Sequence, residues 1–78
     1  MKKKVYIVTY CSCYDELYTE TNVHTDKEKA EEQFLNYVAD IHETEREEFD
    51  PEEYKGKTYF SEGYDGHLYL VQLSEQEI

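Results

Sequence analysis

The stretch YIVTYCSCYDELY, residues 6–18, decides between two folds, because its tyrosines recur every four residues, at positions 6, 10, 14 and 18. A spacing of four fits one face of a helix, and any even spacing fits one face of a strand. A helix here would crowd the β-branched residues of VYIVT, whereas a strand accommodates them readily. The polar segment SCYDEL inside the stretch favours a turn. We therefore expect a β-hairpin, with Tyr6 and Tyr10 on one face of its first strand, Tyr14 near the turn and Tyr18 in its second strand.

The two strands of this hairpin are expected to cover residues 4–11 and 17–24. The apolar residues of KVYIVTYC do not alternate cleanly, which predicts a central strand that is covered on both faces. The residues of LYTETNVH, by contrast, alternate between two faces, which predicts a half-exposed strand. One face carries polar and aromatic residues, and the other carries Leu17, Thr19, Thr21 and Val23.

A helix is expected over about residues 26–45. Thr25-Asp26-Lys27-Glu28 fits a capping box, in which the threonine oxygen accepts a hydrogen bond from a free backbone N–H and the glutamate reaches back. Apolar residues then recur with a helical period and form one stripe. The helix must end before Pro51, which cannot continue it. The stripe consists of Ala30, Phe34, Tyr37, Val38 and Ile41.

The remainder of the chain predicts an acidic connection and a second hairpin. Residues 46–56 form the connection, and Phe49 and Tyr54 are expected to attach it to the body of the domain. The hairpin strands are expected at about residues 57–64 and 67–73, joined by the turn pair Asp65-Gly66, with Phe60 opposite Val71. The tail SEQEI is expected to fray.

Together these elements predict one α+β domain over residues 1–78, with one helix packed on a four-stranded antiparallel sheet in the order ββαββ. A chain of 78 residues has room for one thin core and no deep active-site cavity. The lysines at residues 2–4 precede an apolar segment, VYIV, that is too short for a signal-peptide core. We expect a soluble, cytoplasmic protein.

Charge is the most distinctive property of the composition. Nineteen acidic residues face eight basic ones, for a net charge of −11, and three of the eight lie at residues 2–4. Such a body repels the phosphates of nucleic acids and the surfaces of anionic membranes. Nine tyrosines and clear periodicity argue against disorder.

An acidic run in the second half of the chain is the candidate partner-binding site. Such a run can be a solvated face that only improves solubility, or it can mimic the phosphates of a nucleic acid. Tyrosines favour the second interpretation, because they provide a large contact area at low entropic cost and nine exceed what so small a core can bury. The candidate residues are Asp40, Glu43, Glu45, Glu47, Glu48, Asp50, Glu52, Glu53 and Tyr54.

Catalytic, metal and redox chemistry are not expected. Cys11 and Cys13 would point the same way from an extended chain, with Cα atoms about 6.5–7 Å apart, at the limit of disulfide geometry. The three histidines, at positions 24, 42 and 67, lack the paired spacing of a zinc site. No Gly-rich phosphate loop, Ser-His-Asp arrangement or Cys-His arrangement is suggested by spacing. We therefore predict no cofactor, no metal and no enzymatic activity.

The opening pattern KVYIVTY, followed by LYTETNVHTDKEKAEEQFLNYV, resembles small uncharacterised proteins encoded by phages, prophages and Gram-positive bacteria. The resemblance covers about residues 4–38. It implies a ββα core and a mobile-element context, and it carries over no activity and no functional residue. The acidic insertion and the tyrosine-rich second hairpin depart from that pattern. In size and charge the chain is also similar to phage inhibitors of CRISPR nucleases, restriction enzymes and DNA-repair glycosylases.

Two functional hypotheses follow from these features. The first is a non-enzymatic acidic binding protein, a phage-type inhibitor that mimics nucleic acid and blocks a basic host protein. The alternative is a small regulatory or structural interaction module, a homodimer through a sheet edge, whose acidity serves only solubility. An enzyme or metal protein built on Cys11 and Cys13 is a third, weaker alternative.

Overall fold

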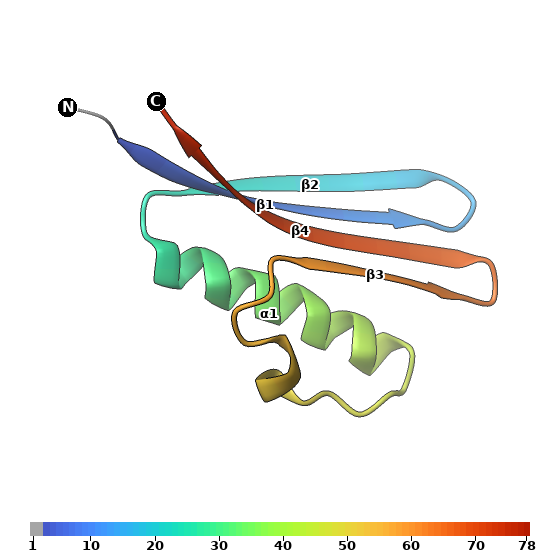
Figure 1. The fold of residues 1–78 in the computed structure, drawn as a ribbon. Coiled ribbons are helices and arrows are strands. Elements are labelled where there is room, and N and C mark those ends of the chain that lie inside the picture. The colour runs from blue at the N-terminus through green and yellow to red at the C-terminus, as the bar shows by residue number, and fades with distance from the viewer. Residues whose placement is uncertain (1–2) are drawn as a thin grey trace.

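The structure is a computed structural model that describes residues 3–78; Met1 and Lys2, part of the basic start of the chain, lie outside the described residues. Four strands form one antiparallel sheet in the order β2-β1-β4-β3, and the single α-helix lies across one face of it (Figure 1). The predicted α+β class is confirmed, although the predicted order ββαββ lacks a short 3₁₀ helix that precedes the third strand. In chain order the elements are β1 (Lys4–Cys13), β2 (Leu17–His24), α1 (Lys27–Thr44), η1 (Pro51–Tyr54), β3 (Tyr59–Tyr64) and β4 (His67–Glu77).

The first hairpin confirms that residues 6–18 are strand, turn and strand. β1 and β2 pair without a bulge from Tyr6↔His24 to Cys13↔Leu17, which leaves a three-residue turn at residues 14–16. β1 is two residues longer than the predicted 4–11, because pairing continues through both cysteines until this short turn closes. Residues directly opposite each other in a sheet share a face, so Tyr6, Tyr10 and Tyr18 all lie on the side that carries α1.

The second hairpin closes on Asp65-Gly66, as predicted. Both residues have positive φ, 42° and 88°, which is the geometry of a two-residue turn that matches the twist of its strands. Phe60 pairs with Val71, again as predicted. β3 begins at Tyr59 and not at residue 57, because the backbone N–H of Lys57 is bonded to the Tyr54 carbonyl of η1.

The C-terminal stretch SEQEI forms part of β4, so the prediction of a frayed tail is wrong. β4 runs to Glu77 and pairs with β1 as far as Lys4↔Glu77. Beyond this pair, Lys3 and Ile78 exchange two backbone hydrogen bonds of 3.1 and 2.8 Å. The N-terminal and C-terminal ends of the described chain therefore lie side by side (Figure 1).

The helix begins and ends within one residue of the predicted 26–45, and it stops well before Pro51. Its cap differs from the predicted one, because Asp26 and not Thr25 is the N-cap residue. The Asp26 carboxylate accepts a 2.9 Å hydrogen bond from the backbone N–H of Glu28. A charged acceptor makes the stronger bond and also suits the positive end of the helix dipole.

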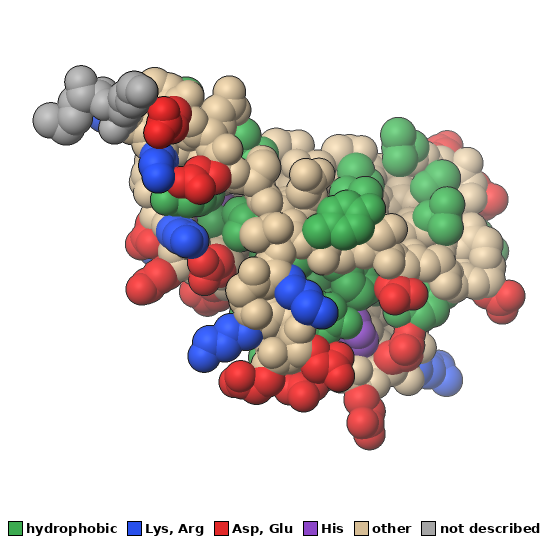
Figure 2. All heavy atoms as spheres, in the orientation of Figure 1, with side chains coloured by type: hydrophobic (Ala, Val, Ile, Leu, Met, Phe, Trp, Pro, Cys, Tyr) green, Lys and Arg blue, Asp and Glu red, His purple; other side chains and the backbone are tan. Residues whose placement is uncertain are grey.

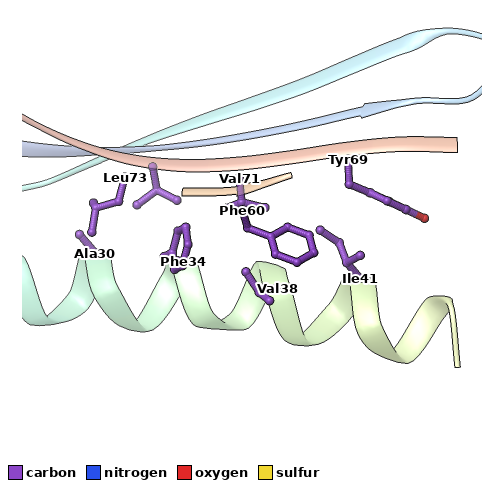
Figure 3. Close-up of a cluster of buried hydrophobic side chains, with 9 residues drawn as sticks. Ala30, Phe34, Val38, Ile41, Phe60, Tyr69, Val71 and Leu73 are labelled. Atoms are coloured by element: carbon purple, nitrogen blue, oxygen red, sulfur yellow. The ribbon is translucent and has the colours of Figure 1, made fainter. Parts of the chain in front are cut away.

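The core lies between α1 and one face of the sheet (Figure 3). Because a single helix covers a single face, the prediction that both faces of residues 4–11 are covered is wrong. On the side of α1, Val8 is fully buried, whereas Val5, Ile7 and Thr9 on the other side are only half-buried. The predicted stripe on α1 is confirmed, with Tyr37 at its half-buried edge. The core consists of Val8, Ala30, Phe34, Val38, Ile41, Phe60, Tyr69, Val71 and Leu73.

Candidate functional site

The acidic segment, residues 40–53 together with Tyr54, starts on the last turns of α1 and continues to η1. Asp40 and Glu43 lie exposed on the helix, which ends at Thr44. Arg46 then turns the chain with a φ of 58°, in the left-handed region. Asp50 caps η1 by accepting a 3.1 Å hydrogen bond from the backbone N–H of Glu52, and Pro51 fits the first helical position. Figure 2 shows carboxylates gathered on this side of the molecule, around η1.

An aromatic cluster holds the acidic segment against α1, as the sequence predicted for Phe49 and Tyr54. The two rings stack, with centroids 5.8 Å apart, and both contact the ring of His42. Buried His42 donates from Nδ1 to the Val38 carbonyl at 2.8 Å, so its Nε2 accepts from the Tyr54 hydroxyl at 3.3 Å. His42 lies one turn after Val38 and so continues the apolar stripe of α1, but a histidine on such a stripe gives no clear signal of a core position.

Two carboxylates of the acidic segment are bonded to tyrosines of the sheet. Tyr69 donates a 2.8 Å hydrogen bond to Glu45. Burial, followed by this bond, raises the pKa of Tyr69 to about 12. Burial and a hydrogen bond with Glu47 likewise raise the pKa of Tyr64. The structure therefore fixes Glu45 and Glu47 on the body of the domain, and Asp50 and Tyr54 have structural contacts as well. The other predicted residues have exposed side chains that take no part in these tyrosine bonds, in the η1 cap or in the aromatic cluster. They are Asp40, Glu43, Glu48, Glu52 and Glu53.

A hollow of about 350 Å³ opens beside this segment, between the first hairpin and the second half of α1. Tyr10 and Tyr37 stack in its wall, with ring centroids 4.9 Å apart, and Tyr18 meets Tyr10 edge-on at 6.2 Å. Glu20 of β2 and Asp40 of α1 also line it, and within residues 3–78 no lysine or arginine does. This tyrosine–carboxylate hollow shares Asp40 with the acidic segment.

The position of the aromatic rings in the hollow is fixed by polar contacts. Asn22 donates a 2.7 Å hydrogen bond to the Tyr37 hydroxyl across the gap between β2 and α1. Burial, followed by the charge of Glu20, raises the pKa of both Tyr18 and Tyr37. Both phenols therefore stay neutral well above physiological pH, so the negative charge in the hollow resides on carboxylates.

A hydrogen-bonded chain of four side chains runs from β1 to the end of α1. Ser12 Oγ lies 2.7 Å from His67 Nε2, and His67 Nδ1 lies 3.2 Å from the Tyr69 hydroxyl. Because the Tyr69 hydroxyl donates its hydrogen bond to Glu45, its oxygen accepts from His67 Nδ1–H, and His67 Nε2 can then accept from Ser12. Sequence spacing gave no sign of this arrangement, since 55 residues separate Ser12 from His67.

Ser12, His67 and Tyr69 are thus arranged like the nucleophile, the base and the orienting group of an acyl-transfer site. The remaining part of such a site is missing around Ser12. Such a site needs free backbone N–H groups for the developing oxyanion. Ser12 and its neighbours lie in a strand that is paired on both sides, to β2 and to β4, which engages the backbone groups around it. The arrangement therefore rigidifies the floor of the hollow, where His67 stacks on Tyr69 with centroids 4.1 Å apart.

The face of the sheet opposite α1, here called the open face, carries no charged residue of β1–β4. All five charged strand residues, Lys4, Glu20, Glu62, Glu75 and Glu77, lie on the side of α1. The open face instead presents apolar and neutral side chains, of which Leu17, Val23, Tyr59 and Leu68 are well exposed. Green side chains are visible over the sheet in Figure 2, away from the acidic segment.

Both cysteines lie on this open face as free thiols. The hydroxyl of Thr19 donates to Cys11 Sγ at 3.7 Å. Within residues 3–78, no group of three or more histidine, cysteine or acidic side chains is arranged to hold a metal ion. The absence of a cofactor and of enzymatic activity stays a prediction.

No helix in the described part of the chain has the length and apolar character needed to cross a membrane. No protein-family model, curated protein or solved structure matches the chain.

Proposed function

We propose that the chain is a non-enzymatic acidic binding protein that occupies the nucleic-acid site of a basic partner, as a phage-type inhibitor of the anti-CRISPR or anti-restriction class acting in the host cytoplasm. One observation carries this proposal: the tyrosine–carboxylate hollow adjoins the acidic segment and shares Asp40 with it. The hollow offers aromatic rings and carboxylates, and within residues 3–78 no lysine or arginine lines it. Such a lining suits arginine and lysine side chains of a partner.

The way the carboxylates are held supports this proposal. Asp40 and Glu43 lie one turn apart on a helix, and Glu52 and Glu53 lie on η1, which the aromatic cluster attaches to α1. Carboxylates on rigid elements lose little entropy when they meet a partner. Phosphates in one strand of a duplex recur about every 3.4 Å along the helix axis, so a partner that binds them is built for closely spaced negative charges.

Neutralising four exposed acids of the segment is expected to weaken binding of a basic partner by well over tenfold. The variant is Glu43→Gln, Glu48→Gln, Glu52→Gln and Glu53→Gln, which spares the carboxylates bonded to tyrosines, the Asp50 cap and the hollow. The loss is expected mainly in the association rate, because complementary charge acts on the encounter. Binding kinetics with a partner captured from host lysate measure it, at about 50 and about 200 mM salt, between which screening increases.

A matched control removes the same number of charges at exposed positions outside the segment. It carries Asp15→Asn, Glu16→Gln, Glu31→Gln and Glu32→Gln. This control is expected to bind within about threefold of wild type. Nucleic acid should compete with the wild-type protein for the partner. A partner that is not basic, or that binds equally well at both salt concentrations, contradicts the proposal.

A second candidate function, the homodimeric interaction module, is favoured by the open face. Two copies that each carry −11 charges repel each other over most of their surface. The open face avoids this repulsion, because its strand residues are uncharged. Contiguous exposed apolar side chains such as Leu17 and Leu68 also mark interaction surfaces in general. We therefore propose that such a dimer forms through this sheet face, whereas the sequence alone suggested one through a sheet edge.

Placing like charges on the open face should dissociate such a dimer. Leu17→Lys with Leu68→Lys is expected to raise the dimer dissociation constant at least tenfold, because each ammonium would be desolvated between the two sheets. Sedimentation equilibrium measures the constant, and Glu31→Gln with Glu32→Gln on the exposed side of α1 is the control, because it changes the net charge by the same amount. A wild-type protein that stays monomeric up to about 1 mM excludes the homodimer as a functional state.

A further inference from the structure

We propose that the tyrosine–carboxylate hollow is a binding site for the guanidinium group of an arginine on the partner. This inference rests on the proposed function, because it names the side chain that the same region of the protein would receive. Its basis is the combination of aromatic rings and carboxylates in one hollow of about 350 Å³, within the size range of small-ligand pockets.

The aromatic part of the hollow suits a flat cation. The rings of Tyr10 and Tyr37 lie nearly parallel, at 12°, and Tyr18 stands at 68° to Tyr10. The facing sides of Tyr10 and Tyr37 cover each other, so a guanidinium group would stack on an outer ring face, where the quadrupole attracts it. It is also more weakly hydrated than an ammonium group, so moving it from water into the hollow costs less.

The carboxylates of the hollow suit the hydrogen-bonding edge of the same group. Glu20 comes from β2 and Asp40 from α1, so the two carboxylates reach the hollow from separate elements. A guanidinium group carries five N–H donors in a planar fork, which allows it to bond carboxylates while its face lies on a ring. An ammonium group, as a compact point charge, uses this arrangement less well.

Charge excludes other ligands of similar size. Within the described chain, the side chains lining the hollow provide two carboxylates and no lysine or arginine to oppose them. Phosphates, nucleotides and carboxylate metabolites are therefore repelled. A neutral ligand would leave the charges uncompensated, whereas a guanidinium group neutralises one of them.

The geometry of the site is fixed before a ligand binds. The hydrogen bond from Asn22 holds Tyr37, and the chain from Ser12 through His67 to Tyr69 and Glu45 holds the floor. A site on rigid strands and a helix keeps its carboxylates and rings in place, which lowers the entropic cost of binding.

The test uses small probes and needs no identified partner. N-acetyl-arginine amide is titrated into the wild-type protein and followed through amide and tyrosine ring resonances by NMR. N-acetyl-citrulline amide is the matched control, because it has nearly the same shape without the charge, and N-acetyl-lysine amide tests the planar fork. We expect saturable shifts at the hollow with the arginine probe, at least tenfold weaker binding of the citrulline probe and intermediate binding of the lysine probe.

Variants then assign the binding to the hollow. Glu20→Gln with Asp40→Asn is expected to weaken arginine binding at least tenfold, and Tyr18→Leu to weaken it several-fold without any change in charge. Glu31→Gln with Glu32→Gln should leave it unchanged. Equal binding of the arginine and citrulline probes, or shifts equally large in the Glu20 and Asp40 variant, overturns the inference.

The two proposals can fail separately. If the arginine probe does not bind but the acidic segment still governs binding of a basic partner, the inference fails and the proposed function stands. If the arginine probe binds in the hollow but no basic partner depends on the acidic segment, the site stands and the proposed function fails.

Discussion

Phe34→Ala is expected to lower the free energy of unfolding by about 3–5 kcal/mol, through the lost transfer energy of the ring and the cavity left behind. Phe34 is 1% exposed and lies at the centre of the stripe that α1 presents to the sheet (Figure 3). Domains of this kind are stable by about 5–15 kcal/mol, so the loss removes a large share of the total. Denaturant titration followed by circular dichroism measures it.

The matched control for this prediction is Glu32→Ala on the exposed side of the same helix. It should change the free energy of unfolding by about 0.5 kcal/mol or less, since it removes no buried contact. Similar losses for the two variants would place the core on a different face of α1.

Deleting residues 75–78 is expected to lower the free energy of unfolding by about 2–4 kcal/mol, the sum of several backbone hydrogen bonds worth about 0.5–1.5 kcal/mol each. The deletion removes the pairs from Tyr6↔Glu75 to Lys4↔Glu77, and both hydrogen bonds between Lys3 and Ile78. The same denaturant titration measures the loss.

Glu75→Ala provides the control for the deletion, because it keeps the backbone and removes only a side chain. Its 3.0 Å ion pair with Lys4 is exposed to solvent, so its loss should change the free energy of unfolding far less than the deletion does. A deletion variant as stable as wild type would mean that the end of β4 frays, as its polar sequence alone suggested.

The elements that could be predicted from the sequence are those specified by local patterns. The helix was placed to within one residue, because the period of its stripe and the requirement to stop before Pro51 are both local. The Asp65-Gly66 turn was predicted for the same reason, since positive φ at both positions favours these residue types. The cap was predicted at Thr25, one residue too early, although aspartate is in general the better N-cap residue.

The features that were predicted wrongly depend on partners far along the chain. The polar stretch at 74–77 is a strand only because β1 starts early enough to pair with it. The apolar residues Val5 and Ile7 suggested a covered face, but residues 3–78 contain only one α-helix to cover the sheet. η1 is different, since its start has a local signal: Asp50 is a favourable cap residue and Pro51 suits the first helical position.

The candidate site could be predicted in part for the same physical reason. The acidic segment is continuous in sequence, so its residues could be named, although the bonds that Glu45 and Glu47 make with tyrosines could not. The hollow combines Tyr10 and Glu20 of the first hairpin with Asp40 of the helix, and Ser12 meets His67 only through the register of β1 with β4. Nothing in the spacing of these residues along the chain indicates that they meet.

The position of β4 has a consequence for how the protein is made. β4 leaves the ribosome after the other three strands, yet it lies between β1 and β3 and provides Tyr69, Val71 and Leu73 to the core. Until it emerges, β1 lacks one of its two neighbours and β3 lacks its only one. Contacts between such distant parts of a chain form late, because the loop between them must close first. The nascent chain therefore completes its core only after β4 has emerged, and its partly covered first hairpin is exposed to chaperones and proteases until then.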